Sequence, residues 1–281
     1  MASHAYLTGT RPLPAAAYLN LLYLPVPGAR FRARCDSPVG RESGSAPPPA
    51  PGDPDIRVRY RWILGHHAAF MVWRLISERL ESIASDNSPN RADVTDAARL
   101  HDIYAALFVY TGSCSPERYA ATVRADMRAC HPAFSGEWAP DHAPIRPLLD
   151  RVRAAHPRRR LEPLPSAVRD CHSVHRAIAD RLVPEGGSLL RDAGREPGQP
   201  PTEVEHTLYD GFFRVVRRPT CRACFDSQLL DRTEQMLRDL AAHGLTDRRG
   251  PRPPLGAATV RNRIEDLSRF AAHHGNARRV R

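Results

Sequence analysis

Apolar residues recur at intervals of three and four along most of the chain after residue 57, which is the period of an amphipathic α-helix. The longest such segment is 59–85, and it stops before the turn-forming sequence DNSPN. A second segment begins near Asp93 and breaks at TGSCSP, and a third follows Pro116, with Ser115 as a suitable N-cap. The same pattern predicts further helices over residues 148–157, 166–183, 203–218, 226–244 and 258–275.

Strand patterns, in which apolar and polar residues alternate, are almost absent. The sequence therefore predicts an all-α fold, a helical bundle in one domain over residues 57–281. The apolar run AYLNLLYLPV lies within residues 1–33, which we expect to form an N-terminal arm, either a strand or a short segment against the body. Residues 34–56 are rich in proline, glycine and serine, and this composition is typical of a flexible linker.

The net charge of +10 raises the question of nucleic-acid binding. All 41 basic residues are arginines, and they are scattered along the chain with only short clusters such as HPRRR and NARRVR. This distribution indicates a compositional bias rather than one basic surface, so we expect no nucleic-acid partner. The absence of lysine also excludes a pyridoxal phosphate enzyme and a P-loop nucleotide-binding protein, since both need a lysine.

No apolar run approaches the length of a membrane span, and the first apolar run lacks the flanks of a signal peptide. We therefore expect a cytoplasmic protein with no membrane partner, in which the six cysteines are reduced. The pair Cys221 and Cys224 has the CxxC spacing of a zinc knuckle, but no second CxxC or CxxH completes four ligands. The simpler interpretation is that both cysteines are structural.

One histidine stands within the apolar face of the helix predicted over 166–183. That face comprises Val168, Cys171, His175, Ile178 and Leu182. An imidazole in such a position needs a partner, because a buried polar group without one is costly. A hydrogen bond to a backbone carbonyl would satisfy it, and so would coordination of a metal or haem iron.

A second helix, within the sequence GHHAAFMVW, also directs an imidazole inward. His67 shares a helical face with Ile63 and Phe70, and His66 shares the next face with Trp62 and Trp73. Because both faces are partly apolar, periodicity does not choose between the two histidines. Two helices that each bury a histidine, without HExxH or a carboxylate cluster, favour a haem between helices over a zinc or di-iron site. The absence of CxxCH argues against a c-type haem.

Three landmarks in order resemble the haem-binding helical family that includes tryptophan 2,3-dioxygenase. A distal histidine followed six residues later by tryptophan corresponds to His67 and Trp73. A substrate-binding arginine seven residues before Ser-Gly corresponds to Arg128, Ser135 and Gly136. An axial histidine followed by arginine six residues later and a glycine-rich loop corresponds to His175, Arg181 and PEGGS.

The sequence departs from the dioxygenases at the substrate pocket, where Ala68 and Glu137 replace an expected glutamine and an aromatic residue. Within the superfamily the chain is most similar to the haem-dependent L-tyrosine 3-hydroxylases. This resemblance implies haem b with His175 as axial ligand, His67 as the distal catalytic base, and Arg128, Ser135 and Gly136 at the substrate. It also implies hydrogen peroxide as oxidant, L-tyrosine as small-molecule substrate, L-DOPA as product for alkyl-proline antibiotics, and a homo-oligomer, either a dimer or a tetramer.

Several alternatives remain at this point. The first alternative is another haem oxygenase of the superfamily that acts on an indole or a methyl-tyrosine. The second is a basic helical nucleic-acid-binding protein without haem. A zinc protein that uses Cys221 and Cys224 is a third alternative. His206, with aromatic neighbours in VEHTLYDGFF, competes with His175 as the axial ligand.

Overall fold

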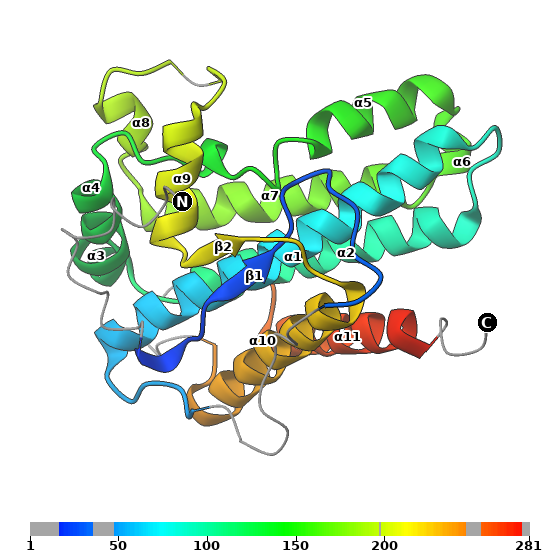
Figure 1. Ribbon diagram of the computed structural model, residues 1–281. Coiled ribbons are helices and arrows are strands. Elements are labelled where there is room, and N and C mark those ends of the chain that lie inside the picture. Colours follow the sequence, from blue (N-terminus) through cyan, green and yellow to red (C-terminus); the bar gives the residue numbers. More distant parts are fainter. Residues whose placement is uncertain (1–16, 36–47, 197, 246–253, 277–281) are drawn as a thin grey trace.

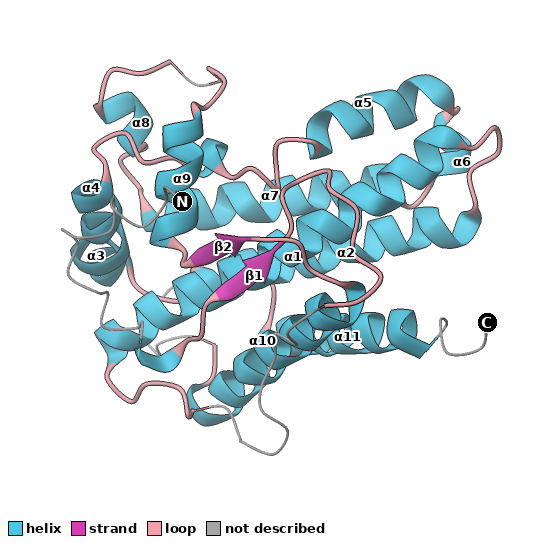
Figure 2. Cartoon of the chain, in the orientation of Figure 1, coloured by secondary structure: helices cyan, strands magenta, loops and turns pink. Residues whose placement is uncertain are grey.

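The computed structural model describes residues 17–35, 48–196, 198–245 and 254–276, and these residues are mainly helical (Figures 1 and 2). The all-α prediction is confirmed. The α-helices are α1 (Pro54–Ser85), α2 (Arg91–Thr111), α3 (Pro116–Tyr119), α4 (Ala125–Cys130), α5 (Ile145–Ala155), α6 (Arg158–Leu161), α7 (Leu164–Leu182), α8 (Leu189–Asp192), α9 (Glu203–Phe212), α10 (Arg222–His243) and α11 (Ala257–Asn276). Two strands are present, β1 (Leu22–Leu24) and β2 (Val215–Arg217). No helix among the described residues is long and apolar enough to cross a membrane.

Helices α1, α2 and α7 form the centre of the bundle, with α2 between the other two. Two glycines permit this close packing. A Cβ on Gly65 of α1 would lie 2.2 Å from the Thr111 side chain, and a Cβ on Gly112, just after α2, would lie 2.5 Å from the side chain of Ile178. The three helices therefore approach each other at positions that exclude a larger residue. Gly65 directly precedes His66 and His67. The close approach of Gly65 to Thr111 therefore fixes the position of both histidines along the axis of α2.

A buried ionic network joins α1, α2 and α10. The Arg61 side chain donates to Asp239 at 2.6 Å, and the Tyr110 hydroxyl donates to the same carboxylate at 2.9 Å. The guanidinium also donates to the Ser113 hydroxyl and to the carbonyl of Gly244. Both ionic side chains are almost fully buried. A paired charge of this kind is tolerated in a core only because its hydrogen bonds are satisfied by several partners.

The predicted helix after Pro116 is confirmed, and the Ser115 hydroxyl accepts a hydrogen bond from the Arg118 backbone as an N-cap. The helix is not uniform. A π-helical segment, η2 (Ala120–Arg124), separates α3 from α4. Such a segment inserts extra backbone into the helix and rotates the residues that follow. The side chains of α4, including Arg128, consequently do not continue the helical face set by α3.

The helix predicted over 203–218 is wrong in its second half. Helix α9 ends at Phe212, and Arg214 adopts a positive φ of 57°. Residues Val215–Arg217 then form β2, which pairs in parallel with β1 from the N-terminal arm, Leu22 opposite Val215. The positive φ is incompatible with a continuing helix. The N-terminal arm is thus a strand against the body, one of the two forms expected for it.

The division of the chain into arm, linker and catalytic domain stays a prediction. Residues 36–47 of the expected linker 34–56 lie outside the described residues, as do residues 1–16 of the arm. Helix α1 begins at Pro54, where Asp53 accepts hydrogen bonds from the backbone of Asp55 and Ile56. The helical body therefore starts three residues before the boundary expected at residue 57.

Candidate active site

Helix α7 places His175 at the edge of its apolar face. Val168, Cys171, Ile178 and Leu182 of the predicted face are buried, whereas His175 is exposed. Its ring stacks on Phe108 of α2, with centroids 4.3 Å apart and an interplanar angle of 18°. The ring forms no hydrogen bond with any residue in the described part of the chain. The protein around the ring lowers its pKa by desolvation, and His172 lowers it further. His175 is therefore a neutral imidazole without a hydrogen-bonding partner.

His66 of α1 is the second neutral imidazole of the site. Its Nδ1 donates to the carbonyl of Trp62 at 2.7 Å, so the lone pair of the neutral ring lies on Nε2. The ring stacks on Phe213 at 4.4 Å. Desolvation lowers the pKa of His66 to about 4, although the Trp62 hydrogen bond opposes this shift; His175 of α7 contributes to the lowering.

His101, His142 and His172 are grouped here with His66 and His175. We call these five residues the histidine cluster. Desolvation lowers the pKa of His142 to about 4 although part of its ring is exposed, and His175 is the next largest cause. The pKa of His101 is likewise about 4, because it is buried in α2 and lies near His172. Ring contacts connect part of this group: His142 contacts Trp73, Trp73 contacts Tyr104, and Tyr104 packs on Phe108, on which His175 stacks.

His67, the histidine expected at the distal side, is more deeply buried than its neighbour His66, and both contact Phe213. It is 0% exposed, and its Nε2 donates to the carbonyl of Phe213 at 2.6 Å. Its Nδ1 is buried without a hydrogen-bond partner in the described residues. Desolvation lowers the pKa of His67, and the nearby charge of Arg232 on α10 adds to this shift. The side of α1 that carries His67 therefore meets the end of α9 at Phe213 and lies near Arg232 of α10.

The residues expected at the substrate lie on and after α4. Arg128 is exposed and forms no ion pair or hydrogen bond with another described residue. Ser135 is half-buried and its hydroxyl accepts from the backbone of Glu137, while the neighbouring Gly136 is exposed. Between them and the core stand Phe134 and Trp138, both buried. The structure thus leaves the Arg128 guanidinium free to bind a carboxylate.

The remaining landmark residues hold helices in place. Arg181 donates to the carbonyls of Gly112 and Cys114 and so ties α7 to the end of α2. His206 of α9, the competing axial ligand, donates from Nδ1 to the carbonyl of Trp138 at 2.8 Å. The role of His206 in the fold is therefore a contact between α9 and the short helix η3 (Gly136–Trp138).

A comparison with protein families identifies the chain. Residues 24–170 match the family described as SfmD 3-methyl-L-tyrosine peroxygenase. The chain belongs to this family. Its members are haem-dependent enzymes, so the resemblance to haem-dependent tyrosine hydroxylases is confirmed at the level of the family. A comparison with curated proteins gives no significant match.

The part that matches the peroxygenase family includes His66, His67, Arg128 and His142, and it ends just before His175. The donor set of the structure fits a haem. His66 of α1 and His175 of α7 offer imidazoles, the ligand type that haem iron prefers, beside the aromatic rings of Phe213 and Phe108. No sequence signal identified His142, because it lies in the segment AFSGEWAPDHAPIRP, which shows no periodicity.

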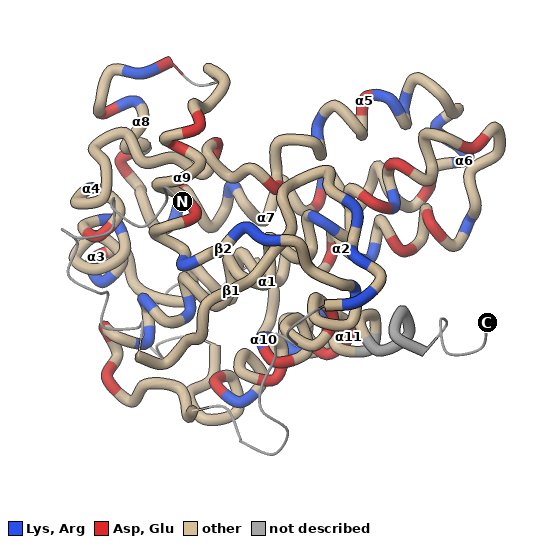
Figure 3. Tube along the Cα trace, in the orientation of Figure 1, with Lys and Arg blue, Asp and Glu red and all other residues tan. Residues whose placement is uncertain are grey.

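The charged residues in the described part of this chain are spread over the structure and do not form one basic surface. Basic and acidic residues are interspersed along most of the trace (Figure 3). Several arginines are held in ion pairs within the fold; Arg217, for example, bridges Asp141 and Asp210. Part of the positive charge is thus neutralised by ion pairs within the fold.

Proposed function

We propose that this protein hydroxylates the ring of a tyrosine-type amino acid with hydrogen peroxide as oxidant. The carbon that is hydroxylated is the one ortho to the phenol hydroxyl, which is the ring 3-position of L-tyrosine. One oxygen atom of peroxide enters the C–H bond and the other leaves as water. The family match carries this proposal, since the family consists of haem peroxygenases for such a substrate. The neutral histidine cluster supports it by providing ligands suited to haem.

His175 is the residue that we propose as the axial ligand of a b-type haem. Its ring has no hydrogen-bond partner in the described part of the chain and is uncharged, so a nitrogen lone pair is available to iron. The stacked Phe108 ring limits how the imidazole can turn. When bound, haem supplies the chemistry that splits peroxide and delivers oxygen to the ring.

His66 is the residue that we propose as the base, in place of His67. The hydrogen bond from Nδ1 to Trp62 fixes the tautomer, so Nε2 can accept a proton from peroxide or from the substrate phenol. His66 is half-buried and its pKa is influenced by His175, whereas His67 is fully buried and its Nε2 donates to the carbonyl of Phe213, just after α9. The sequence alone favoured His67 by its spacing to Trp73. The burial of His67 is the observation that favours its neighbour.

Arg128 is proposed to hold the substrate carboxylate, with Ser135 and Gly136 nearby on the chain. A guanidinium binds a carboxylate through two parallel hydrogen bonds, a geometry that lysine does not match. Because Arg128 has no partner in the described structure, it does not need to break an ion pair before binding substrate.

Two substrates follow from different observations. The family description names 3-methyl-L-tyrosine, and the resemblance of the sequence landmarks favours L-tyrosine. Reaction of the haem-loaded protein with peroxide and each amino acid in turn, with the products identified by mass spectrometry, decides between them. Absence of a ring-hydroxylated product from either amino acid would contradict the proposed function. The homo-oligomer remains a prediction, which light scattering of the purified protein tests. The role in antibiotic biosynthesis also remains a prediction.

The two adjacent histidines give opposite expected results. His66→Ala should keep its fold and haem but lose turnover by about 10²–10⁴-fold, the usual contribution of a general base. Because the pKa of His66 is about 4, the base is neutral at higher pH, and the rate of the wild type should fall only as the pH drops towards 4. Turnover numbers of both variants and the pH profile of the wild type are the measurements.

His67→Ala is the matched variant for that experiment. It removes a core side chain and leaves the Phe213 carbonyl without its donor, so it should lower the melting temperature. At temperatures where it remains folded, its turnover should stay within a few-fold of wild type. A His67→Ala protein with wild-type stability but no turnover would instead restore His67 as the base.

Arg128→Leu should weaken substrate binding with little effect on the rate at saturation. Loss of a charged hydrogen bond costs about 1.5–3 kcal/mol, which corresponds to an increase in KM of roughly 10- to 150-fold. Arg128→Lys should recover part of this loss. Arg151→Leu, at an exposed arginine of α5, is the control and should leave KM unchanged. An unaltered KM in Arg128→Leu would mean that the carboxylate binds elsewhere.

A further inference from the structure

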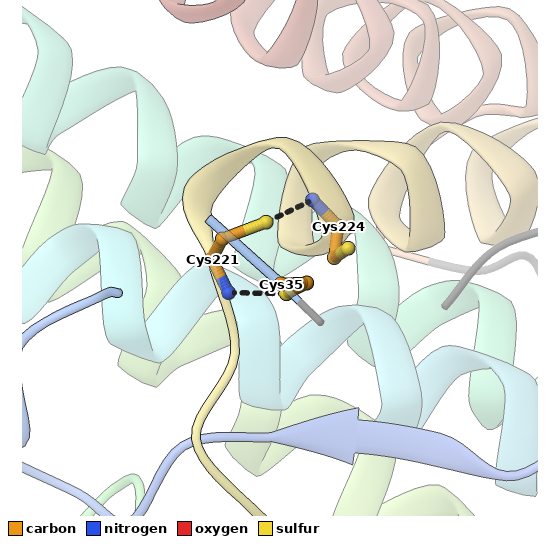
Figure 4. A group of neighbouring side chains, drawn as sticks. All are labelled: Cys35, Cys221 and Cys224. Carbon is orange, nitrogen blue, oxygen red and sulfur yellow. Dashed lines mark hydrogen bonds between the residues drawn. The ribbon is translucent and has the colours of Figure 1, made fainter. Parts of the chain in front are cut away.

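Three cysteines from distant parts of the sequence meet at the N-terminus of α10 (Figure 4). Cys221 is the N-cap of α10, Cys224 lies in its first turn, and Cys35 comes from the segment that follows β1. The three Sγ atoms all lie within 4.8 Å of one another. None of them is in a disulfide. Cys221 and Cys224 are buried and Cys35 is half-buried.

The backbone around these sulfurs favours thiolates. The Cys221 N–H donates to the Cys35 Sγ at 3.0 Å, and the Cys224 N–H donates to the Cys221 Sγ at 3.4 Å. Both donors belong to the first residues of a 22-residue helix, whose N-terminus attracts negative charge. Thiolates held by backbone N–H groups at a helix start are the form in which cysteine binds metals.

The spacing of the sulfurs fits one ion. Zinc binds thiolates at about 2.3 Å in a tetrahedron, which sets neighbouring sulfurs roughly 3.8 Å apart. The observed upper limit of 4.8 Å needs a closure of at most about 1 Å, within reach of side-chain rotation. We propose that Cys35, Cys221 and Cys224 bind one Zn²⁺ ion, with the fourth position taken by water or another exogenous ligand. This inference is independent of the haem and of the proposed function.

Such an ion would lock the N-terminal arm to the body. The arm already meets the start of α10 through the hydrogen bond from the Arg32 backbone to Thr220 and the ring contact of Phe31 with Phe225. A metal that joins residue 35 to residues 221 and 224 closes a very long loop, and this restricts the unfolded chain most. We therefore expect the bound zinc to stabilise the contact between the N-terminal arm and α10.

Metal content of the reduced, full-length protein tests the proposal. After incubation with zinc and removal of the excess, elemental analysis should find one zinc per chain, counted separately from haem iron. Cobalt added in place of zinc should give the absorption bands of thiolate-bound, tetrahedral cobalt. Cys35→Ser and the double variant Cys221→Ser/Cys224→Ser should lose the zinc, and Cys130→Ser, a cysteine outside the cluster, should keep it.

Two results would overturn the proposal. One is a reduced wild-type protein that takes up neither zinc nor cobalt with thiolate bands, a measurement that does not depend on any variant folding. The other is a double variant that is folded by circular dichroism and still holds one zinc per chain. A disulfide among the three cysteines, found by mass spectrometry in protein that cannot be loaded with metal, would assign the cluster to thiol oxidation instead.

Discussion

His175→Ala should purify without haem, or with haem that lacks the spectrum of histidine ligation, and should lose peroxygenase activity. The loss of a partner outside the ligand shell already weakens metal binding by about 10- to 100-fold, and loss of the ligand itself should exceed this. The fold should survive, because the His175 ring is exposed and forms no hydrogen bond with a described residue. A haem titration followed by absorption, together with thermal unfolding, measures both effects.

Two other histidines provide the comparison. His172→Ala changes an exposed imidazole of the same helix and should retain haem binding. His206→Ala removes the contact between α9 and η3 and should lower stability while the haem stays. If His206→Ala loses the haem and His175→Ala keeps it, the axial ligand belongs to α9 and the proposed site is wrong.

Asp239→Ala should be among the most destabilising single substitutions in this chain. It leaves the buried Arg61 guanidinium without its carboxylate and the Tyr110 hydroxyl without its acceptor. Breaking a buried ion pair by removing one partner costs about 3–5 kcal/mol. Denaturant unfolding should show this as a lower midpoint with an unchanged slope. Tyr110→Phe, which removes only one hydrogen bond, should cost about 1 kcal/mol.

Two controls separate charge burial from a general effect of mutation. The double variant Arg61→Met/Asp239→Leu removes both charges and should be more stable than Asp239→Ala, because no unpaired ion remains. Asp150→Ala breaks the exposed pair with Arg153 and should change stability by no more than about 0.5 kcal/mol. A stability of Asp239→Ala equal to that of Asp150→Ala would contradict the network as a stabilising element.

The helices were largely predictable because their signals are local. Apolar spacing and a polar stop located α1 and α2 within a few residues, and the Ser115 cap located the start of α3. The end of α9 was not predictable in this way. The apolar run continues through Phe213 and Val215, and only the positive φ of Arg214 divides it into a helix and a three-residue strand. A strand so short has no room to show alternation.

The site was predictable only in part. The apolar face of α7 selected His175 from sequence alone, but its exposure depends on where Phe108 of α2 lies. The choice between His66 and His67 depends on Phe213, just after α9, whose carbonyl accepts a hydrogen bond from His67 although it lies 146 residues further along the sequence. Cys35 could not be joined to Cys221 and Cys224 either. It stands beside a segment rich in proline, glycine and serine, and its partners come 186 residues later.

The parallel pairing of β1 with β2 has a consequence for how the chain is made. Tyr23 of β1 exchanges hydrogen bonds with Gln228, 205 residues further along the sequence. During synthesis, β1 emerges before β2 and α10, so it has no partner until both have left the ribosome. Closing so long a connection is slow compared with forming the local contacts of α1 and α2. The arm is thus translated before its partners and is among the last segments to find its place.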